Sequence, residues 1–307
     1  MLSELDLSLG ALEIGILLSS VLWGVTTIQV YIYVTTSNKD PLWTKAIVYL
    51  VWSLESFHTI FIWIYLYRLT VTFYGIPTVL EKTHWTLDTS SFFDGIIGTM
   101  VQMFFAYRIR AFSKSWSITL ISWTGALLNL ACTMGVTILS ESLSLPVTVF
   151  TARFGWIIEA SLTLSLIVDI INTTMFSYHL FRQRTGFKGT DVVLEKLVSW
   201  TMETGLVTMI AAAVELIFFK VTSSTALWIA VSFFSAKLYS NSLLAILNSR
   251  SLIARSLPVS AQTDTNVVRS WSGTQSGVLV TVVQGREDIE LGSIKRMNDS
   301  ERNPQCL

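Results

Sequence analysis

Residues 10–34 read GALEIGILLSSVLWGVTTIQVYIYV, an apolar run whose only charged side chain is Glu13. A helix rises about 1.5 Å per residue, so about 20 apolar residues cross the hydrocarbon core of a bilayer, which is roughly 30 Å thick. No basic residue precedes the run, and it lacks the small-residue pattern of a signal-peptide cleavage site. We therefore interpret residues 10–34 as a retained first transmembrane helix.

Further runs of the same kind follow along the chain. They cover residues 45–67, 91–109, 117–139, 154–180, 197–219 and 226–248. The weakest predictions are the run at 91–109, with Asp94 and Gln102, and the run at 197–219, with Glu203 and Glu215, because a charged group at a helix centre costs about 2.5 to 3.5 kcal/mol. Their Ile, Leu, Met, Phe and Val residues offset that cost. The predicted fold class is all-α: a polytopic membrane protein with a seven-transmembrane-helix bundle.

The composition agrees with a membrane protein and excludes several other classes. Hydrophobic residues make up 51% of the chain and charged residues 14%, against about a quarter charged in ordinary soluble domains. The net charge is zero, so no overall field attracts nucleic acid. The only cysteines, Cys132 and Cys306, allow neither a disulfide framework nor a four-thiolate metal site. We expect the lipid bilayer as a partner, and no nucleic acid, metal or cofactor.

The orientation follows from the positive-inside rule, which places Lys and Arg of short loops in the cytoplasm. One side of the alternating loops and helix ends holds Lys39, Lys45, Arg108, Arg110, Lys114, Arg182, Arg184, Lys188, Lys196, Arg250 and Arg255. The other side holds only Arg68, Lys82, Arg153 and Lys220. We expect an extracellular N-terminus (1–9), a transmembrane domain (10–249) and a flexible, polar cytoplasmic tail (250–307). We expect the plasma membrane and not an internal one.

Ionisable residues inside the predicted spans are the first candidates for function, because they are expensive in lipid and usually face the bundle interior. Counting helical rise, Glu55 and Lys237 both fall near the midplane, and Asp169 lies slightly inward of it. Asp94 lies nearer the outer surface, as does Glu215. Glu55 and Lys237 are the first pair to test.

Two more polar residues share helix faces with this pair. His58 follows Glu55 by three residues, and Asn241 follows Lys237 by four. If the second and seventh helices are neighbours, as in familiar seven-helix bundles, these four residues could form one polar network. Two interpretations stay open: an ion pair that only sets helix register, or a ligand-binding or switching site.

A second group of candidates is basic and lies at the predicted inner ends of the third, fifth and sixth helices. It consists of Arg108, Arg110, Arg182, Arg184 and Lys188. These side chains could contact lipid phosphates or a cytoplasmic signalling partner. Orientation of the chain by charge alone explains them as well.

Several stretches resemble a large family of seven-helix membrane proteins from mushroom-forming fungi, known mainly by a domain of unknown function over the later helices. They include Thr27-Ile-Gln-Val-Tyr31, Leu54-Glu-Ser-Phe-His58, Phe92-Phe-Asp-Gly95, Val101-Gln-Met-Phe-Phe-Ala-Tyr-Arg108, Arg184-Thr-Gly-Phe-Lys188, Glu203-Thr-Gly205 and Lys237-Leu-Tyr-Ser-Asn-Ser-Leu-Leu-Ala245. Lys237 and Asn241 match the family's pattern directly, whereas Asp94 and Glu203 stand where asparagine is usual. The resemblance implies a seven-helix fungal membrane protein and supplies no established activity.

The sequence favours a receptor-like or sensory protein with a small-molecule ligand, because basic inner loops precede a tail with Ser and Thr that kinases could modify. The alternative is a small-solute or proton-coupled transporter that uses the midplane polar residues. Against it, no internal repeat and no proline within a predicted span is found. We do not expect an enzyme, because no metal triad or nucleophile with its base is recognisable.

Overall fold

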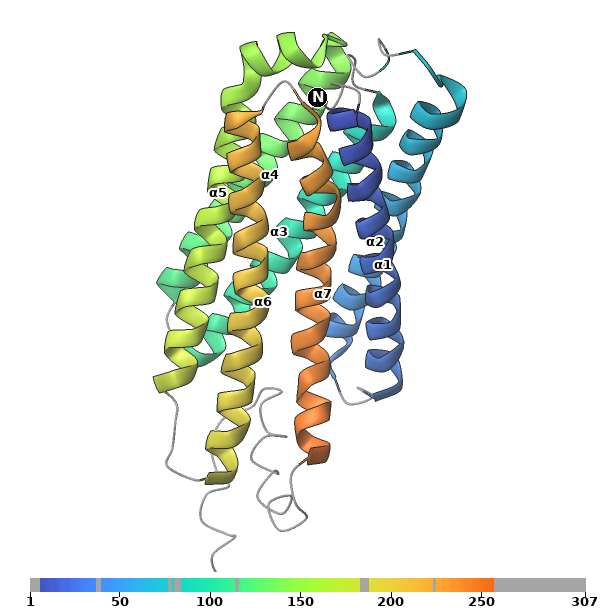
Figure 1. The fold of residues 1–307 in the computed structure, drawn as a ribbon. Helices are drawn as coiled ribbons and strands as arrows, with labels where there is room; N and C mark the ends of the chain where they lie inside the picture. The colour runs from blue at the N-terminus through green and yellow to red at the C-terminus, as the bar shows by residue number, and fades with distance from the viewer. Residues whose placement is uncertain are drawn as a thin grey trace, which may run out of the picture. The chain divides into compact units, whose positions relative to one another are not determined.

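The computed structural model describes residues 6–36, 40–76, 79, 84–113, 116–182, 188–222 and 225–256. These residues lie within one compact unit, Met1–Ala261, and form a bundle of α-helices (Figure 1). The helices are α1 (Ala11–Thr36), α2 (Leu42–Tyr67), α3 (Trp85–Ser113), α4 (Trp116–Leu143), α5 (Val147–Arg182), α6 (Lys188–Val221) and α7 (Leu227–Ser256). Short π-helical segments, Asp6–Gly10 and Arg68–Thr72, precede α1 and follow α2. These described ranges contain no strand.

The seven predicted helices are confirmed as helices, and their ends are where the prediction differs from the structure. α3 begins at Trp85 and not at 91, α6 begins at Lys188 and not at 197, and α7 ends at Ser256 and not at 248. An apolar window detects only the part of a helix that lies in hydrocarbon, while the hydrogen-bonded backbone continues into polar surroundings. The remainder of the predicted tail, and residues 1–5, lie outside the described residues.

Six of the helices are long and apolar enough to cross a membrane. Their spans are Ser8–Thr36, Leu42–Thr72, Trp116–Leu143, Val147–His179, Met202–Val221 and Leu227–Ser249. α3 has the length, but Asp88, Asp94, Arg108 and Arg110 make its composition too polar. It packs against α2, α4, α5 and α7. These neighbours cover much of its surface, so its polar groups can turn toward protein and away from lipid.

α7 differs from the other five candidate spans, which we call the outer helices, in how much of each helix is covered by protein. In α7, 72% of the most apolar window is buried, against 17% to 33% in the other five candidate spans. The outer helices present large apolar side chains outward, such as Ile14, Ile28 and Trp156, as a lipid-facing surface requires. Among these six spans, α7 is therefore the one whose sequence is least constrained by lipid, in agreement with its Ser, Asn and Lys content.

Consecutive helices pack side by side, and contacts between α1 and α7 close the ring. α3 also reaches across to α5 and α7, so these helices meet in the interior. One buried apolar cluster includes Tyr33, Val51, Phe104 and Leu243. A second, toward the end at which α1 begins, includes Leu12, Ile62 and Phe233.

The α1–α7 contact depends on a glycine. A Cβ atom at Gly15 would stand 2.5 Å from the carbonyl oxygen of Ala230, a backbone atom that cannot move aside without shifting α7. Small residues permit this kind of close helix approach in membranes. We predict that Gly15→Ala lowers the free energy of unfolding by about 1–3 kcal/mol, as overpacking does in cores.

The matched control is Gly24→Ala on the same helix, where a Cβ has nothing within 4 Å. The measurement is the thermal unfolding midpoint of each protein purified in detergent. Equal midpoints for the two variants would contradict the close α1–α7 contact.

Candidate functional site

The centre of the bundle contains a buried ion pair between α2 and α7. Lys237 Nζ donates to the carboxylate of Glu55 and, at 3.0 Å, to the backbone oxygen of Glu55. Ser240 Oγ, one turn after Lys237, donates to the other carboxylate oxygen. Both charged side chains are completely buried. The structure thus brings together the two residues that the sequence placed near the midplane, and each charge has a partner.

The other two members of the predicted network lie differently from the expectation. Asn241 turns toward α1, where its amide nitrogen donates to Thr26 Oγ1 at 2.9 Å and to the backbone oxygen of Leu22. α7 packs mainly against α1 and only slightly against α2, so a residue four positions after Lys237 meets α1. His58 is buried, and among the described residues its Nδ1 has no hydrogen-bond partner.

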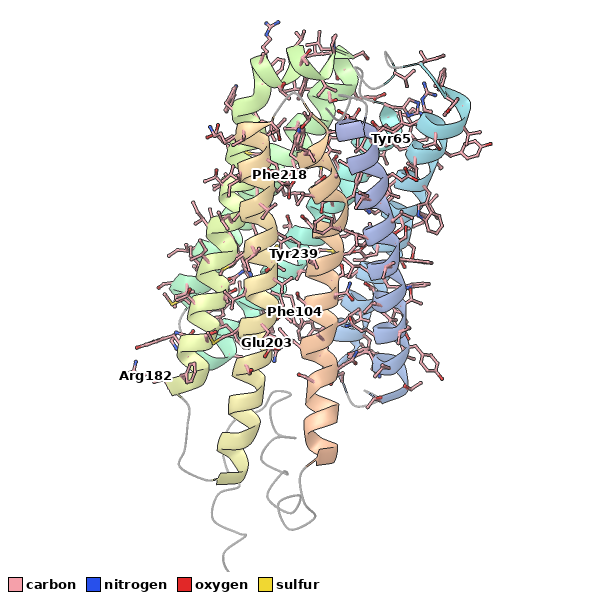
Figure 2. The ribbon with its side chains drawn as sticks, viewed as in Figure 1. Tyr65, Phe104, Arg182, Glu203, Phe218 and Tyr239 are labelled. Carbon is pink, nitrogen blue, oxygen red and sulfur yellow. The ribbon has the colours of Figure 1, made fainter. Side chains whose placement is uncertain are left out.

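Asp169 belongs to a separate polar cluster between α3, α5 and α7. It accepts a hydrogen bond from Tyr239 Oη at 2.6 Å and one from Gln102 Nε2 at 2.9 Å. Ser165 contacts Tyr239 Oη at 3.1 Å, and Asn172 donates to the backbone oxygen of Gln102. Figure 2 marks Tyr239 on α7. Asp169 is thus satisfied by neutral donors and takes no part in the Glu55–Lys237 pair.

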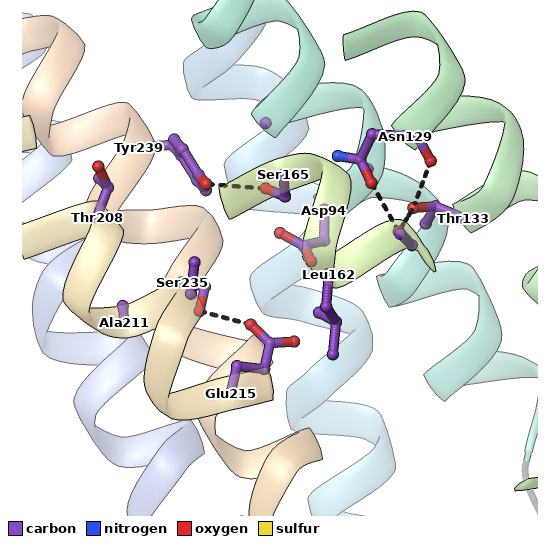
Figure 3. A pocket seen from close by; sticks show the side chains of 14 residues that line it. Asp94, Asn129, Thr133, Leu162, Ser165, Thr208, Ala211, Glu215, Ser235 and Tyr239 are labelled. Carbon is purple, nitrogen blue, oxygen red and sulfur yellow. Dashed lines mark hydrogen bonds between the residues drawn. The ribbon is translucent and has the colours of Figure 1, made fainter. Parts of the chain in front are cut away.

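Asp94 lines a polar cavity between α3, α4, α5, α6 and α7, which we call the acidic cavity (Figure 3). Its volume, about 60 Å³, is room for several waters or one small solute. Its polar lining consists of Asp94, Asn129, Thr133, Ser161, Ser165, Thr208, Glu215, Ser235 and Tyr239. Apolar wall is contributed by Gly95, Gly98, Leu162, Ala211 and Ala212.

The charges of the acidic cavity are unbalanced. Glu215, which is 7% exposed, accepts a hydrogen bond from Ser235 Oγ at 3.2 Å. Asp94 lines the same cavity as Glu215 and accepts no hydrogen bond from any described residue. The described lining contains no Lys, Arg or His. An acid placed so in low dielectric is costly unless a proton, water or ligand satisfies it.

A second, smaller cavity lies along α5, α6 and α7 toward the end at which α7 ends. Asp169, Asn172, Thr204 and Ser242 line it, and Thr208 and Tyr239 line both cavities. The hydroxyl group of Tyr239 donates to Asp169, which lines the second cavity, and contacts Ser165, which lines the first. Tyr239 therefore lies at the boundary of the two polar spaces.

The basic residues predicted at the inner helix ends do not gather into one described site. Arg108 lies over the ring of Phe176, with its guanidinium carbon 5.3 Å from the ring centroid, and Arg110 lies over Trp116 at 3.4 Å. Arg182, labelled in Figure 2, donates to Tyr178 Oη at 3.4 Å. Arg184 lies outside the described residues, and Lys188 begins α6 with a side chain that is not described.

Sequence reasoning missed most of the acidic cavity. The sequence places Glu215 near the outer surface as a charged residue but does not predict the neutral lining. One signal was available: cavity residues recur four apart on one helix, as in Asn129 with Thr133 and Ser235 with Tyr239. Such pairs are weak signals, because many hydroxyls here bond to their own helix, as Thr26 Oγ1 does to the oxygen of Leu22.

Comparison with known proteins gives one match. Residues 165–252 are similar to a family of unknown function (DUF6534). No curated protein and no solved structure matches the chain. The expectation of a domain of unknown function over the later helices is confirmed. The match covers the second half of α5, all of α6 and most of α7, including Asp169, Glu215 and Lys237, and its description assigns no activity.

The Asp169 cluster yields a direct test. Tyr239→Phe removes the hydroxyl donor and leaves one buried oxygen of Asp169 without it, so we predict a loss of about 1–3 kcal/mol of stability. Tyr67→Phe, at an exposed position at the end of α2, is the matched control. The readout is again the thermal unfolding midpoint in detergent. If the two variants unfold at the same temperature, the hydroxyl of Tyr239 does not support the bundle.

Proposed function

We propose that the chain is a multi-pass membrane protein of a receptor-like or sensory kind, with a small polar ligand that binds in the acidic cavity. The observation that carries the proposal is the carboxylate of Asp94, which has no hydrogen-bond partner among the described residues. It lines a cavity in the bundle interior that is large enough for several waters. Ionisable groups held at such cost inside a membrane protein generally mark a functional site. The Glu55–Lys237 pair, whose charges satisfy each other, acts in this account as a structural element.

α7 supplies a way to transmit the presence of a ligand. Ser235 and Tyr239 border the acidic cavity, and Lys237 between them is held by Glu55. A ligand that moves Tyr239 would change its bond to Asp169, which lies toward the end at which α7 ends. Differential contacts of this kind can shift a two-state equilibrium of the bundle.

The remaining parts of the proposal rest on the predictions made from the sequence. The N-terminus is outside, the tail is in the cytoplasm, and α3 crosses the membrane as the seventh span beside the six that are apolar enough alone. We place the protein in the plasma membrane and in a family of fungal seven-helix membrane proteins. Arg108, Arg110, Arg182, Arg184 and Lys188 are proposed contacts for lipid phosphates or a cytoplasmic partner. We propose no catalytic activity.

A transporter is the second candidate, and one observation favours it. The acidic cavity and the second cavity share Thr208 and Tyr239, so a solute could pass from one polar space to the other when Tyr239 moves. The ionisable groups along this route also suit proton coupling. The helices lining it contain no proline, so broken helices of the usual transporter kind are not expected there.

The test of the ligand site uses a matched pair on α6. Ala212 lines the acidic cavity, whereas its neighbour Ala213 is half-buried and does not. In a thermal-shift screen of small amines, sugars, amino acids and organic acids, we predict a solute that stabilises wild type and Ala213→Leu but not Ala212→Leu. A ligand present at 100 times its Kd contributes about 2.7 kcal/mol, enough for a clear shift.

A screen without any stabilising solute, or one whose effect survives equally in Ala212→Leu, would contradict the ligand site. The same solute then separates the two candidate functions. Uptake into proteoliposomes above the level of protein-free vesicles would favour the transporter. Binding without uptake would favour the receptor-like protein.

A further inference from the structure

The acidic cavity has features beyond its two acids that indicate what it binds. Asn129 is 7% exposed, and its side-chain oxygen accepts a hydrogen bond from Ser161 Oγ at 2.6 Å. Its side-chain nitrogen donates to no described residue, and Figure 3 shows it directed away from Thr133. A buried amide donor and an unpartnered carboxylate in one cavity each lack a partner that a bound solute would supply.

The charges of the surrounding helices set the sign of that solute. Asp94 and Glu215 come from α3 and α6, and both line the cavity. The nearby pair of Lys237 and Glu55 is neutral as a unit and does not belong to the lining. An anion would therefore meet two carboxyl groups without a free positive charge, whereas a cation would relieve their mutual repulsion.

The size and walls of the cavity limit the cation further. About 60 Å³ accommodates only a few non-hydrogen atoms. Ala211, Ala212 and Leu162 provide an apolar wall beside the carboxyl groups, which suits a short carbon chain better than a bare ion. Among the described residues no group of three or more His, Cys, Asp or Glu side chains could hold a metal ion.

We propose that the acidic cavity binds a small organic cation, a protonated amine with one hydroxyl group. Its ammonium group contacts Asp94 and Glu215. Its hydroxyl oxygen accepts a hydrogen bond from Asn129 Nδ2, and its short body lies against Ala211 and Leu162. The hydroxyls of Ser235 and Thr208, which line the same space, would accept the remaining N–H bonds. This inference rests on the proposed function, because it names the chemical class of the ligand at that same site.

The test compares probes of matched shape on the full-length protein in detergent at constant ionic strength. Ethanolamine carries the charge, ethylene glycol is its neutral counterpart, potassium chloride supplies a bare cation, and tetraethylammonium is too large. Binding is measured by titration calorimetry and by the thermal shift. We predict that only ethanolamine binds, and that Asp94→Asn and Glu215→Gln each weaken it at least about tenfold, or about 1.4 kcal/mol.

Further variants test whether ethanolamine binding depends on the charge at the cavity or on the overall charge of the protein. Glu13→Gln removes an exposed acid of α1 and should leave ethanolamine binding unchanged. Asp94→Asn keeps the shape of the side chain and removes no internal hydrogen bond, so it should fold. Gly98→Ala adds a methyl group 4.0 Å from the Tyr239 ring, without a clash, and should weaken binding by filling the cavity.

The outcomes distinguish this inference from the function on which it rests. Equal binding of ethylene glycol and ethanolamine, or ethanolamine binding that Asp94→Asn and Glu215→Gln leave intact, would overturn the organic cation and leave a ligand cavity. Binding of potassium in place of ethanolamine would also overturn it. If none of these probes binds while a sugar, amino acid or organic acid gives a shift that Ala212→Leu abolishes, the inference fails and the proposed function stands. If nothing binds, both fail.

Discussion

A charged side chain in a hydrocarbon slab must find its partner within the protein, and the Lys237–Glu55 ion pair is the interaction on which the rest of the bundle depends. It joins α2 and α7, which otherwise share little surface. The pair thereby sets the depth and rotation of α7, the most buried of the six apolar spans. With α7 so placed, Tyr239 borders the acidic cavity and Asn241 meets α1.

Three acids in the bundle interior show three ways of meeting this constraint. Glu55 is neutralised by Lys237 and also accepts a bond from Ser240. Asp169 has no cation but accepts bonds from Tyr239 and Gln102. Asp94 has neither among the described residues and faces a cavity instead. Because the chain satisfies the first two acids so completely, the third is the one that indicates binding of something from outside.

The helices could be predicted from sequence because bilayer thickness sets the length of an apolar run, and helical rise alone placed Glu55 and Lys237 at a common depth. Depth says nothing about which helices are neighbours or how each is rotated. Asp94 and Glu215 were both placed near the outer surface, yet nothing in the sequence showed that they face one cavity. For the same reason Asn241 was assigned to the Glu55 network, although α7 packs mainly on α1.

The most direct test of this account is a double-mutant cycle on the ion pair, measured as the free energy of unfolding in detergent of wild type, Glu55→Gln, Lys237→Met and the double variant. Each single change leaves a buried charge unpaired, and we predict a loss of about 3–5 kcal/mol for each. The double variant has no unpaired charge and should lose much less than the sum of the two. Additive losses would show that the two residues do not depend on each other, and the central role given to the pair would be wrong.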